Sequence, residues 1–549
     1  MIRFGQTIPA QLGAVRDSDI PSLYLHWRLL LAVLSGIMLC IPWLNPGLFW
    51  VAWVGWVPLL VALDGTRLPT AMLVGWVAGV ACFAGASNWM IEFAINLKGL
   101  SYPVSLSMAI LFWCYAGIST ALGCLLYRWL SLRLPNLEVL IFPLCIVTSV
   151  ALYPSLFEIH FAEGQAGFLP ALQGVALFGV QALDALIMMV SVLLFLAWRN
   201  RSLLFTLRQL PNSLAALAVV GWFVYGFASL AWWDRQIAGW ETRAVGLVQP
   251  NDPVSLEIPP PPEGFSLEYP EEMVATERLM RAGAHWVAWP EARYKGYFDN
   301  YSVRQAYSER VRELGGALIF HDVESRWVNS VLESYNSVTM LDANGEPGEI
   351  YRKMKRMPFG EYLPEFFRLP GIARISSMFL GDFLREVWPG DQHVYFQIGD
   401  MEVVPKICFE TAFPAFVADA IGSDGAGRVL LFVSQDTWFG ESTQPFQHRA
   451  MSIVRGVENR VPMMHVINNG PSVVAAPHGR VVGGAQAFSR AELLVHMPFD
   501  PTSGGSFFSR YPLLFMTMVF SALVMLVLLA AARSVGARRA RRQATNPAL

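Results

Sequence analysis

Long apolar runs separated by short polar connections fill the first half of the chain and return near its end. A helix crosses the hydrocarbon core of a bilayer when about 20 successive residues are predominantly apolar. The pattern therefore predicts eight transmembrane helices. The first two are short and are separated by Asn45-Pro46-Gly47, so a re-entrant hairpin is an alternative there. The predicted spans lie near 28–45, 47–63, 70–95, 103–130, 137–154, 172–198, 213–233 and 512–532.

Between the last two spans the pattern changes to short apolar runs that alternate with helical stretches. Runs of four to six apolar residues bounded by turn residues are typical of buried strands. Strands that alternate with helices indicate a layered α/β domain. A helix is expected over 444–459. The predicted strands are 245–249, 286–289, 317–320, 337–341, 403–407 and 429–433.

These changes of pattern divide the chain into five parts. The N-terminal segment carries Arg3, Arg16 and Asp17, so we expect it to remain as part of the protein rather than to be a cleavable signal peptide. The expected parts are an N-terminal segment (1–27), a membrane domain of about seven helices (28–235), an α/β catalytic domain (241–505), a final transmembrane helix (511–533) and a basic tail (534–549).

The basic residues of the connections predict the orientation of the helices. Cytoplasmic loops of membrane proteins are enriched in Lys and Arg. With a cytoplasmic N-terminus, the inner loops hold most of these basic residues, whereas the outer loop 155–171 has Glu158 and Glu163 but no Lys or Arg. We therefore expect both termini inside and the α/β domain outside. The inner basic residues are Arg67, Arg128, Arg133, Arg199, Arg201, Arg208, Arg533, Arg538, Arg539, Arg541 and Arg542.

Composition narrows the classes of function. The chain is 54% hydrophobic and only 15% charged, which argues against a soluble globular protein. The formal net charge is −2, so the chain has no overall excess of basic residues and nucleic acid is not an expected partner. Charged residues are nearly absent from the span interiors, whereas a transporter would be expected to carry them along its path. A transporter or a receptor with an external sensor domain is therefore disfavoured.

One cysteine differs from the other five in its surroundings. Cys408 follows a predicted strand in the α/β domain, whereas Cys40, Cys82, Cys114, Cys124 and Cys145 all lie in apolar spans. A free thiol becomes a good nucleophile when a base and a cation activate it.

Glu291 and Lys353 also follow apolar runs, and the ends of strands in layered α/β folds converge on a cleft. The residues alone leave structural alternatives open. Cys408 could fill a core, Glu291 could pair with Arg293, and Lys353 could belong to a solvated basic face.

The motifs around these three residues resemble the Glu–Lys–Cys triad of the nitrilase superfamily, also called the carbon–nitrogen hydrolases. The order, the approximate spacing and the flanking spans are similar to one branch, the membrane-bound apolipoprotein N-acyltransferases. The motifs are Trp289-Pro290-Glu291, the run 351–364 with its Pro358-Phe359-Gly360-Glu361-Tyr362 block, Ile407-Cys408-Phe409-Glu410, Ser434–Gly440 with its Trp438-Phe439-Gly440 block, and Asn468-Asn469-Gly470.

The resemblance implies an αββα sandwich and a two-step acyl transfer that needs no cofactor. Cys408 would take an acyl chain from a membrane phospholipid as a thioester. The chain would then pass to the α-amino group of the S-diacylglyceryl cysteine of an apolipoprotein. The implied roles are nucleophile for Cys408, general base for Glu291, oxyanion stabiliser for Lys353, a supporting carboxylate for Glu361, and pocket lining for Phe409 and Glu410.

The same resemblance implies a multi-pass protein of the bacterial inner membrane with its catalytic domain on the periplasmic side. Three places depart from the usual pattern of the branch: Val461, His465 and the loop 158–165. They leave open a paralogue that acylates a different amine or a weakly active relative. A separate alternative is a membrane-tethered amidase that uses the same three residues but deacylates with water. Oligomeric state, headgroup and chain preference are not indicated by the residues.

Overall fold

The computed structural model describes residues 23–253, 261–291, 294–365, 369 and 387–545, and the expected N-terminal segment 1–27 lies mostly outside them. Among the described residues, eight helical segments are long and apolar enough to cross a membrane. They are α1 (Leu25–Leu44), Pro46–Leu63 (η1, α2 and α3), α4 (Leu68–Ala86), α6 (Tyr102–Ser131), Pro135–Leu152 (η2 and α7), α10 (Val180–Arg199), α12 (Leu210–Ile237) and Leu514–Gly536 of α19 (Leu514–Thr545).

Two predicted spans are shorter in the structure because the chain breaks inside them. The run 70–95 ends as α4 at Ala86, and a separate short helix, α5 (Met90–Lys98), follows. The run 172–198 begins at the end of α8 (Leu169–Leu172) and covers α9 (Val175–Phe178) and nearly all of α10. Gly179 separates the last two with φ +78°, a conformation that a side chain disfavours. At the N-terminus, α1 is a continuous helix of 20 residues.

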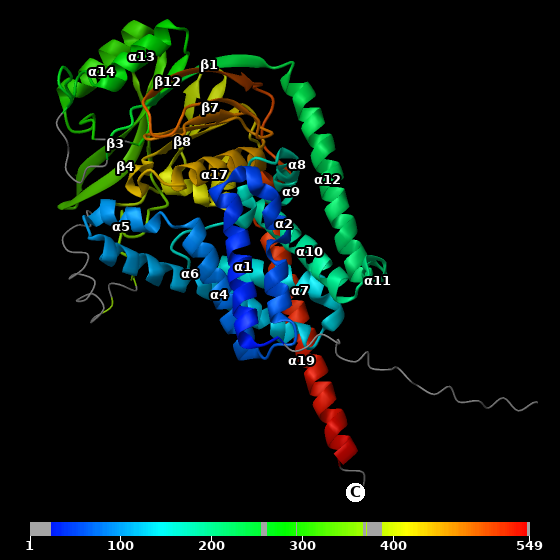
Figure 1. Ribbon diagram of the computed structural model, residues 1–549. Helices are drawn as coiled ribbons and strands as arrows, with labels where there is room; N and C mark the ends of the chain where they lie inside the picture. The colour runs from blue at the N-terminus through cyan, green and yellow to red at the C-terminus, as the bar shows by residue number, and fades with distance from the viewer. Residues whose placement is uncertain (1–22, 254–260, 292–293, 366–368, 370–386, 546–549) are drawn as a thin grey trace, which may run out of the picture.

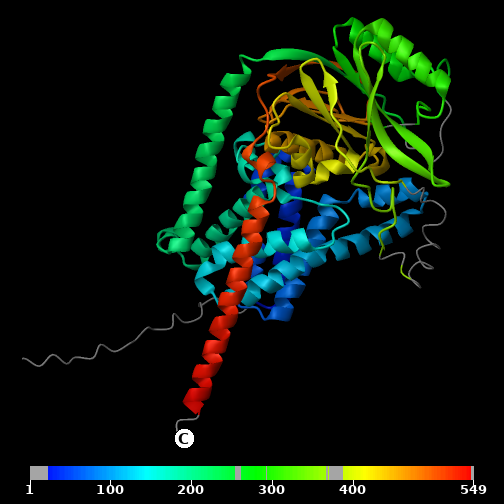
Figure 2. The ribbon, with the colours of Figure 1, turned by 180° about the vertical axis from the view of Figure 1, so that it is seen from behind.

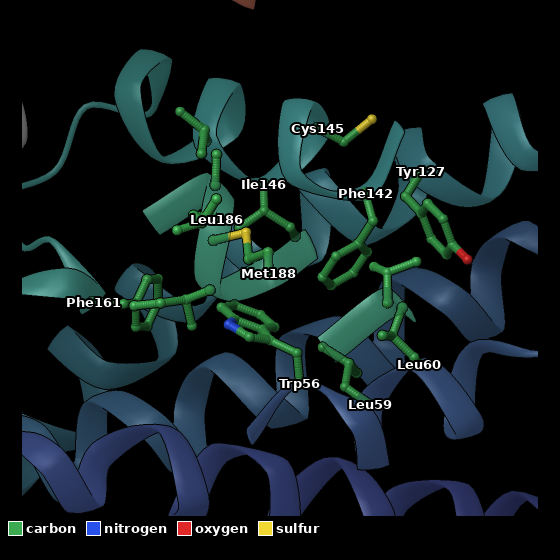
Figure 3. Close-up of a cluster of buried hydrophobic side chains, with 14 of the residues drawn as sticks. Trp56, Leu59, Leu60, Tyr127, Phe142, Cys145, Ile146, Phe161, Leu186 and Met188 are labelled. Carbon is green, nitrogen blue, oxygen red and sulfur yellow. The ribbon is translucent and has the colours of Figure 1, made fainter. Parts of the chain in front are cut away.

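An aromatic and aliphatic core holds the membrane helices together. Trp56 is fully buried, and its ring meets those of Phe142 and Phe161 edge-on at centroid distances of 5.6 and 5.1 Å. Figure 3 shows this group with Leu186 and Met188 beside it. The packing brings residues from four separate helical segments into one cluster.

The α/β domain has four layers, with two six-stranded sheets packed face to face between helices (Figure 1). The first sheet has the order β12-β1-β2-β3-β4-β5 and is covered by α13 (Glu271–Arg281) and α14 (Tyr301–Leu314). Its strands are β1 (Glu241–Gln249), β2 (Trp286–Ala288), β3 (Ala317–Val328), β4 (Val331–Leu341), β5 (Pro347–Arg352) and β12 (Ala491–Phe499).

The second sheet, with the order β11-β10-β9-β8-β7-β6, is covered by α16 (Pro414–Ile421) and α17 (Gln444–Asn459). Its strands are β6 (Phe396–Ile398), β7 (Met401–Ile407), β8 (Arg428–Ser434), β9 (Met463–Ile467), β10 (Val473–Ala475) and β11 (Val481–Gly484).

Strand β8 has a continuous apolar sequence because both faces of the second sheet are buried. Successive side chains of a strand point to opposite faces. Val429, Leu431 and Val433 pack in the core between the two sheets. Leu430 and Phe432 pack on the other face against α16 and α17. Both faces are buried, and the predicted αββα sandwich beside a helical membrane domain is confirmed.

Helix α17 joins the two halves of the molecule. Val454 and Val457 of α17 belong to the hydrophobic core of the membrane helices. The Glu458 carboxylate accepts a hydrogen bond from the backbone N–H of Val180 at 2.7 Å, and Arg460 donates to Gln173 at 2.7 Å. Helices α12 and α19 flank this junction and connect directly to the α/β domain (Figure 2).

Candidate active site

Three strand ends bring the predicted residues together. Glu291 follows β2, Lys353 directly follows β5, and Cys408 directly follows β7. The Lys353 Nζ lies 3.9 Å from Glu291 Oε1. The charged groups that act on the Cys408 thiol include Glu291, Lys353 and Glu361. Residues far apart in the sequence thus form one site at the edge where the two sheets meet.

Lys353 is held by carboxylates and by the neighbouring strand. It is 1% exposed, and its ammonium donates to Glu361 Oε1 at 2.9 Å. Its backbone N–H donates to the carbonyl oxygen of Asn336 on β4 at 2.9 Å. Burial alone would lower the pKa of Lys353, but Glu361 and Glu291 outweigh it and raise the pKa. Lys353 is therefore a fixed cation at neutral pH.

Asn336 connects the two carboxylates around this cation. Its side-chain amide donates to Glu291 Oε1 at 2.6 Å and to Glu361 Oε1 at 2.8 Å. Its oxygen contacts Nε2 of His321 on β3. The second oxygen of Glu361 accepts from the backbone N–H of Met357 at 2.7 Å. Glu361 therefore positions Lys353 and is itself fixed by the turn that carries it.

Glu291 is ionised at neutral pH. Burial alone would raise its pKa, but the charges of Lys353 and His321 and two hydrogen bonds lower it below the ordinary value. These hydrogen bonds come from Asn336 and from the backbone N–H of Gln435, the latter at 3.2 Å. A buried carboxylate without its proton can accept one from a neighbouring thiol.

Cys408 occupies a constrained turn. It begins a short 3-10 helix, η6 (Cys408–Ala412), and its φ of +48° is uncommon for a residue with a side chain. Such strain is concentrated at functional sites, where surrounding contacts compensate for it. Burial and the Glu291 charge raise the pKa of the thiol, and Lys353 opposes them. The thiol is therefore a poor nucleophile until the base takes its proton.

The Glu410 carboxylate fastens this turn to the strand end that carries Lys353. One oxygen accepts from the backbone N–H groups of Met354 and Lys355 at 2.7 and 3.1 Å. The other accepts from the Tyr351 hydroxyl at 2.7 Å and from the Ile407 N–H at 2.8 Å. Glu410 is fully buried, and it does not line the cavity at Cys408. Its partners are backbone N–H groups and the Tyr351 hydroxyl beside the site.

The cavity at Cys408 is lined by both halves of the molecule. Phe409 lines it together with residues of the α/β domain, and Glu158 and Ile159 line it from the loop 158–165. Most of the lining side chains are apolar, which suits an acyl chain. The other lining residues are Trp43, Ala86, Trp89 and Phe157 from the membrane half and Met357, Ala412, Phe439, Gln444, Gln447, His448 and Met451 from the α/β domain.

An aromatic cluster extends from this cavity into the membrane helices. Phe439 stacks on Phe93 of α5 at 5.3 Å and meets Trp89 edge-on at 5.0 Å. Phe157 meets Trp89 at 5.5 Å and Phe409 at 5.8 Å. Phe409, the residue next to Cys408, is thus connected by ring contacts to α5 of the membrane half.

The three departures from the usual pattern lie in different places. Val461 is fully buried in the core between the second sheet and its helices, and His465 is buried on β9. In the loop 158–165, Glu158 and Ile159 reach the cavity. Of the three, the loop is therefore the one that contacts the space beside Cys408.

The sequence did not single out Asn336, Asp436 or His448, although all three lie close to the triad. Asn336 is a polar residue on a buried strand, and His448 is a polar residue on the buried face of α17. A polar side chain on a buried face is the signal that could have revealed them, because such groups need a specific partner.

Two family models match the chain. The carbon–nitrogen hydrolase model matches residues 267–500, and the model of the apolipoprotein N-acyltransferase N-terminal domain matches residues 35–193. Among solved structures, an amidase from Nesterenkonia sp. is 18% identical with a TM-score of 0.35, covering 50% of this chain and 96% of its own.

Curated relatives match over most of their length. The apolipoprotein N-acyltransferase of Geobacter metallireducens is 28% identical over 88% of this chain and 91% of its own. Those of Pseudomonas aeruginosa and Gloeobacter violaceus are 28% and 26% identical, over 84% and 78% of this chain and 88% and 80% of theirs. The two domain models match in the order membrane domain, then α/β domain, and the chain is similar over most of its length to apolipoprotein N-acyltransferases.

Proposed function

We propose that this inner-membrane N-acyltransferase of lipoprotein maturation works through a thioester on Cys408, with a phospholipid as acyl donor and the N-terminal S-diacylglyceryl cysteine of an apolipoprotein as acceptor. The observation that carries the proposal is the cavity at Cys408. It brings a thiol, its base and a cation to an apolar space that membrane helices help to line.

In the first half-reaction Glu291 takes the proton of the Cys408 thiol, and the thiolate attacks an ester carbonyl carbon of the phospholipid. A C–S bond forms, and the carbonyl oxygen becomes an oxyanion that the Lys353 ammonium stabilises. The C–O bond to the glycerol oxygen then breaks. That oxygen takes the proton from Glu291 and leaves as the hydroxyl of a lysophospholipid.

In the second half-reaction the α-amino nitrogen of the acceptor attacks the thioester carbonyl. Glu291 takes a proton from this nitrogen, and a second oxyanion forms beside Lys353. The C–S bond breaks, and the Cys408 thiolate recovers the proton from Glu291. The product is an amide, so the acyl chain has moved from oxygen to sulfur to nitrogen.

The charge distribution of the membrane half supports an external catalytic domain. Arg128 donates to the carbonyl oxygen of Thr66 at 2.7 Å, Arg133 donates to Ser534 at 3.1 Å, and Arg199 pairs with Glu138 at 2.6 Å. These contacts join the C-terminal ends of α6 and α10, the start of α7 and the C-terminal half of α19, whose other end connects to the α/β domain. With basic residues inside, the α/β domain faces the periplasm, where both lipid substrates are anchored in the outer leaflet.

The acyl-enzyme can be trapped directly. The purified protein in lipid nanodiscs is incubated with a phospholipid that carries an alkyne-tagged acyl chain, and the tag on the protein is then quantified. We expect labelling of the wild type that neutral hydroxylamine releases, and no labelling of Cys408→Ala. Cys114→Ala, which removes a half-buried thiol from α6, is the matched control and should label fully. Undiminished labelling of Cys408→Ala would remove Cys408 from the mechanism.

An amidase would hydrolyse the thioester with water, whereas an N-acyltransferase passes the acyl chain to an amine. The labelled protein is isolated and divided between buffer and a synthetic diacylated lipopeptide with a free α-amine. We expect the label to persist in buffer and to move to the lipopeptide. Rapid loss in buffer, with free fatty acid as the product, would indicate a hydrolase.

A further inference from the structure

His448 contacts the backbone carbonyl oxygen of Cys408. Nε2 of His448 on α17 lies 3.0 Å from the carbonyl oxygen of Cys408 and 3.1 Å from Thr411 Oγ1. The Thr411 hydroxyl itself donates to the same carbonyl oxygen at 2.7 Å. On the other side of the ring, Nδ1 lies 2.9 and 3.0 Å from the two carboxylate oxygens of Asp436.

The hydrogen-bond partners of His448 determine the protonation state of its imidazole ring. A carbonyl oxygen and a carboxylate can only accept hydrogen bonds, and Thr411 uses its hydroxyl proton on the Cys408 carbonyl. Both nitrogens of His448 must therefore donate, and the ring is an imidazolium. Imidazole is also the stronger base of the pair, so the shared proton belongs to His448 and Asp436 remains a carboxylate.

The other groups around His448 are compatible with a buried cation. Burial alone would lower its pKa, but Asp436, the Cys408 carbonyl and Glu291 raise it. The ring of His465 on β9 meets it edge-on at 4.6 Å. Burial and the charge of His448 hold the pKa of His465 well below its ordinary value, so His465 is neutral. The Ser434 hydroxyl lies 2.6 Å from Nε2 of His465 and supplies its hydrogen bond.

We propose that His448 is a positioning residue for the nucleophile, a buried imidazolium held by Asp436 that donates to the Cys408 carbonyl and places positive charge behind the thiol. The donation stabilises the left-handed backbone of Cys408, whose φ is +48°. The Asp436 charge by itself raises the pKa of the thiol. The imidazolium lies between Asp436 and the turn, so it opposes that charge and favours the thiolate over the thiol. Lys353 is a second cation that lowers the pKa of the thiol.

The inference rests on the proposed function only for the role of Cys408, and alkylation of the thiol tests it without any acyl transfer. The full-length protein is treated with iodoacetamide from pH 5 to pH 10, and modification of the peptide that contains Cys408 is followed by mass spectrometry. Two substitutions remove the charge in different ways. Asp436→Asn leaves the ring neutral, and His448→Gln retains a side-chain N–H that can reach the carbonyl oxygen.

We expect the rate at pH 7 to fall about tenfold in both variants and the alkylation midpoint to rise by about one pH unit, since one unit of thiol pKa changes the thiolate fraction tenfold. The matched controls are Asp419→Asn and His393→Gln, which alter another His–Asp contact of the α/β domain, where Asp419 is exposed. Both controls should keep the wild-type midpoint. Thermal unfolding confirms that each variant is folded.

An unchanged midpoint in a folded His448→Gln or Asp436→Asn would reduce His448 to a structural hydrogen-bond donor and overturn the proposal. The wild-type profile provides a test that needs no variant. Its rate should rise with a single ionisation through neutral pH, because Asp436 and the Cys408 carbonyl raise the pKa of His448 above its ordinary value. A fall in the rate above about pH 6.5, the ordinary pKa of histidine, would show that His448 loses its proton. Loss of lipid labelling with an intact midpoint shift would contradict the proposed function and leave this inference standing.

Discussion

At the scale of single residues, the site places two carboxylates beside one ammonium. Glu291 and Glu361 both approach Lys353, and the Asn336 amide donates to both carboxylates. Two carboxylates that share a site would otherwise raise each other's pKa. Asn336 and Lys353 together keep Glu291 ionised at neutral pH, which is the state that its proposed role as general base requires.

Replacing Asn336 should therefore change the pH dependence of acylation. The pKa of Glu291 is lowered from its ordinary value of 4.5, so the wild-type rate should fall only when the pH drops below that value. Asn336→Leu removes a hydrogen bond that favours the charged form, and the pKa should rise. We expect the acid limb of the rate of acyl-enzyme formation to move up by about one pH unit. Single-turnover labelling between pH 3.5 and 7 measures the shift.

The control for this experiment is Asn344→Leu, which alters an amide in the exposed turn between β4 and β5. It should leave the acid limb unchanged. An Asn336→Leu profile with the wild-type limb and a uniformly lower rate would mean that Asn336 orders the site without controlling the base.

At the scale of elements, the membrane half and the α/β domain meet through α5 and the short helix η7 (Asp436–Phe439). Asn96 of α5 donates to the carbonyl oxygen of Trp438 at 3.1 Å. Trp89 donates to Gln447 of α17 at 3.0 Å, and Gln447 donates back to the Ala86 carbonyl at 2.7 Å. These bonds hold the aromatic wall of the cavity against the helices that face lipid.

Replacing an aromatic residue of the cavity lining should slow acylation from a phospholipid more than it slows alkylation of Cys408. Phe439→Ala removes the ring contacts with Trp89 and Phe93, each worth about 1 kcal/mol. We expect acylation from a phospholipid to slow about tenfold, while alkylation of Cys408 by iodoacetamide stays within about twofold. Parallel measurement of the two reactions tests this, with Phe446→Ala on α17, which contacts Phe488, as the control. Equal losses in both reactions would mean that Phe439 supports the turn at Cys408.

The sequence predicted part of the two sheets. Strands β6, β9, β10, β11 and β12 were not predicted, although β9 and β10 are fully buried. Helix α17 has the predicted bounds, and the six predicted strands all form, because their apolar runs are buried on both faces. Strand β5 was not predicted, since its alternating exposed and half-buried residues resemble a loop. Strands β3 and β4 extend beyond their apolar runs as a hairpin, where cross-strand pairing continues without burial.

Some residues of the candidate site could be predicted from the sequence, and others could not. Glu291 and Cys408 could be placed together because each follows a predicted strand, and strand ends converge. Lys353 follows β5, which was not predicted, so its place beside them depended on the motif around it. Asn336 and His448 could not be placed there, because they lie within an element, where side-chain direction depends on the packing of distant strands and helices. The pairing of His448 with Asp436 joins α17 to η7, a contact with no local sequence signal.

At the scale of the whole molecule, the orientation of the helices determines which leaflet the site meets. Leu132, 54% exposed, lies in the connection with Arg133, and Thr502 lies in an exposed turn of the α/β domain. A membrane-impermeant maleimide applied to intact spheroplasts should label Thr502→Cys above the wild-type level and label Leu132→Cys only after permeabilisation. Labelling of Leu132→Cys in intact spheroplasts would reverse the proposed topology.

The central claim is that this protein moves an acyl chain to the α-amine of lipoproteins through Cys408. Mass spectrometry of lipoprotein N-terminal peptides, from cells whose only copy of the protein is wild type or Cys408→Ala, tests it most directly. We predict triacylated peptides with the wild type, and diacylated peptides with a free α-amine when Cys408→Ala is the only copy. Triacylated peptides at the wild-type level in the Cys408→Ala cells would contradict the account.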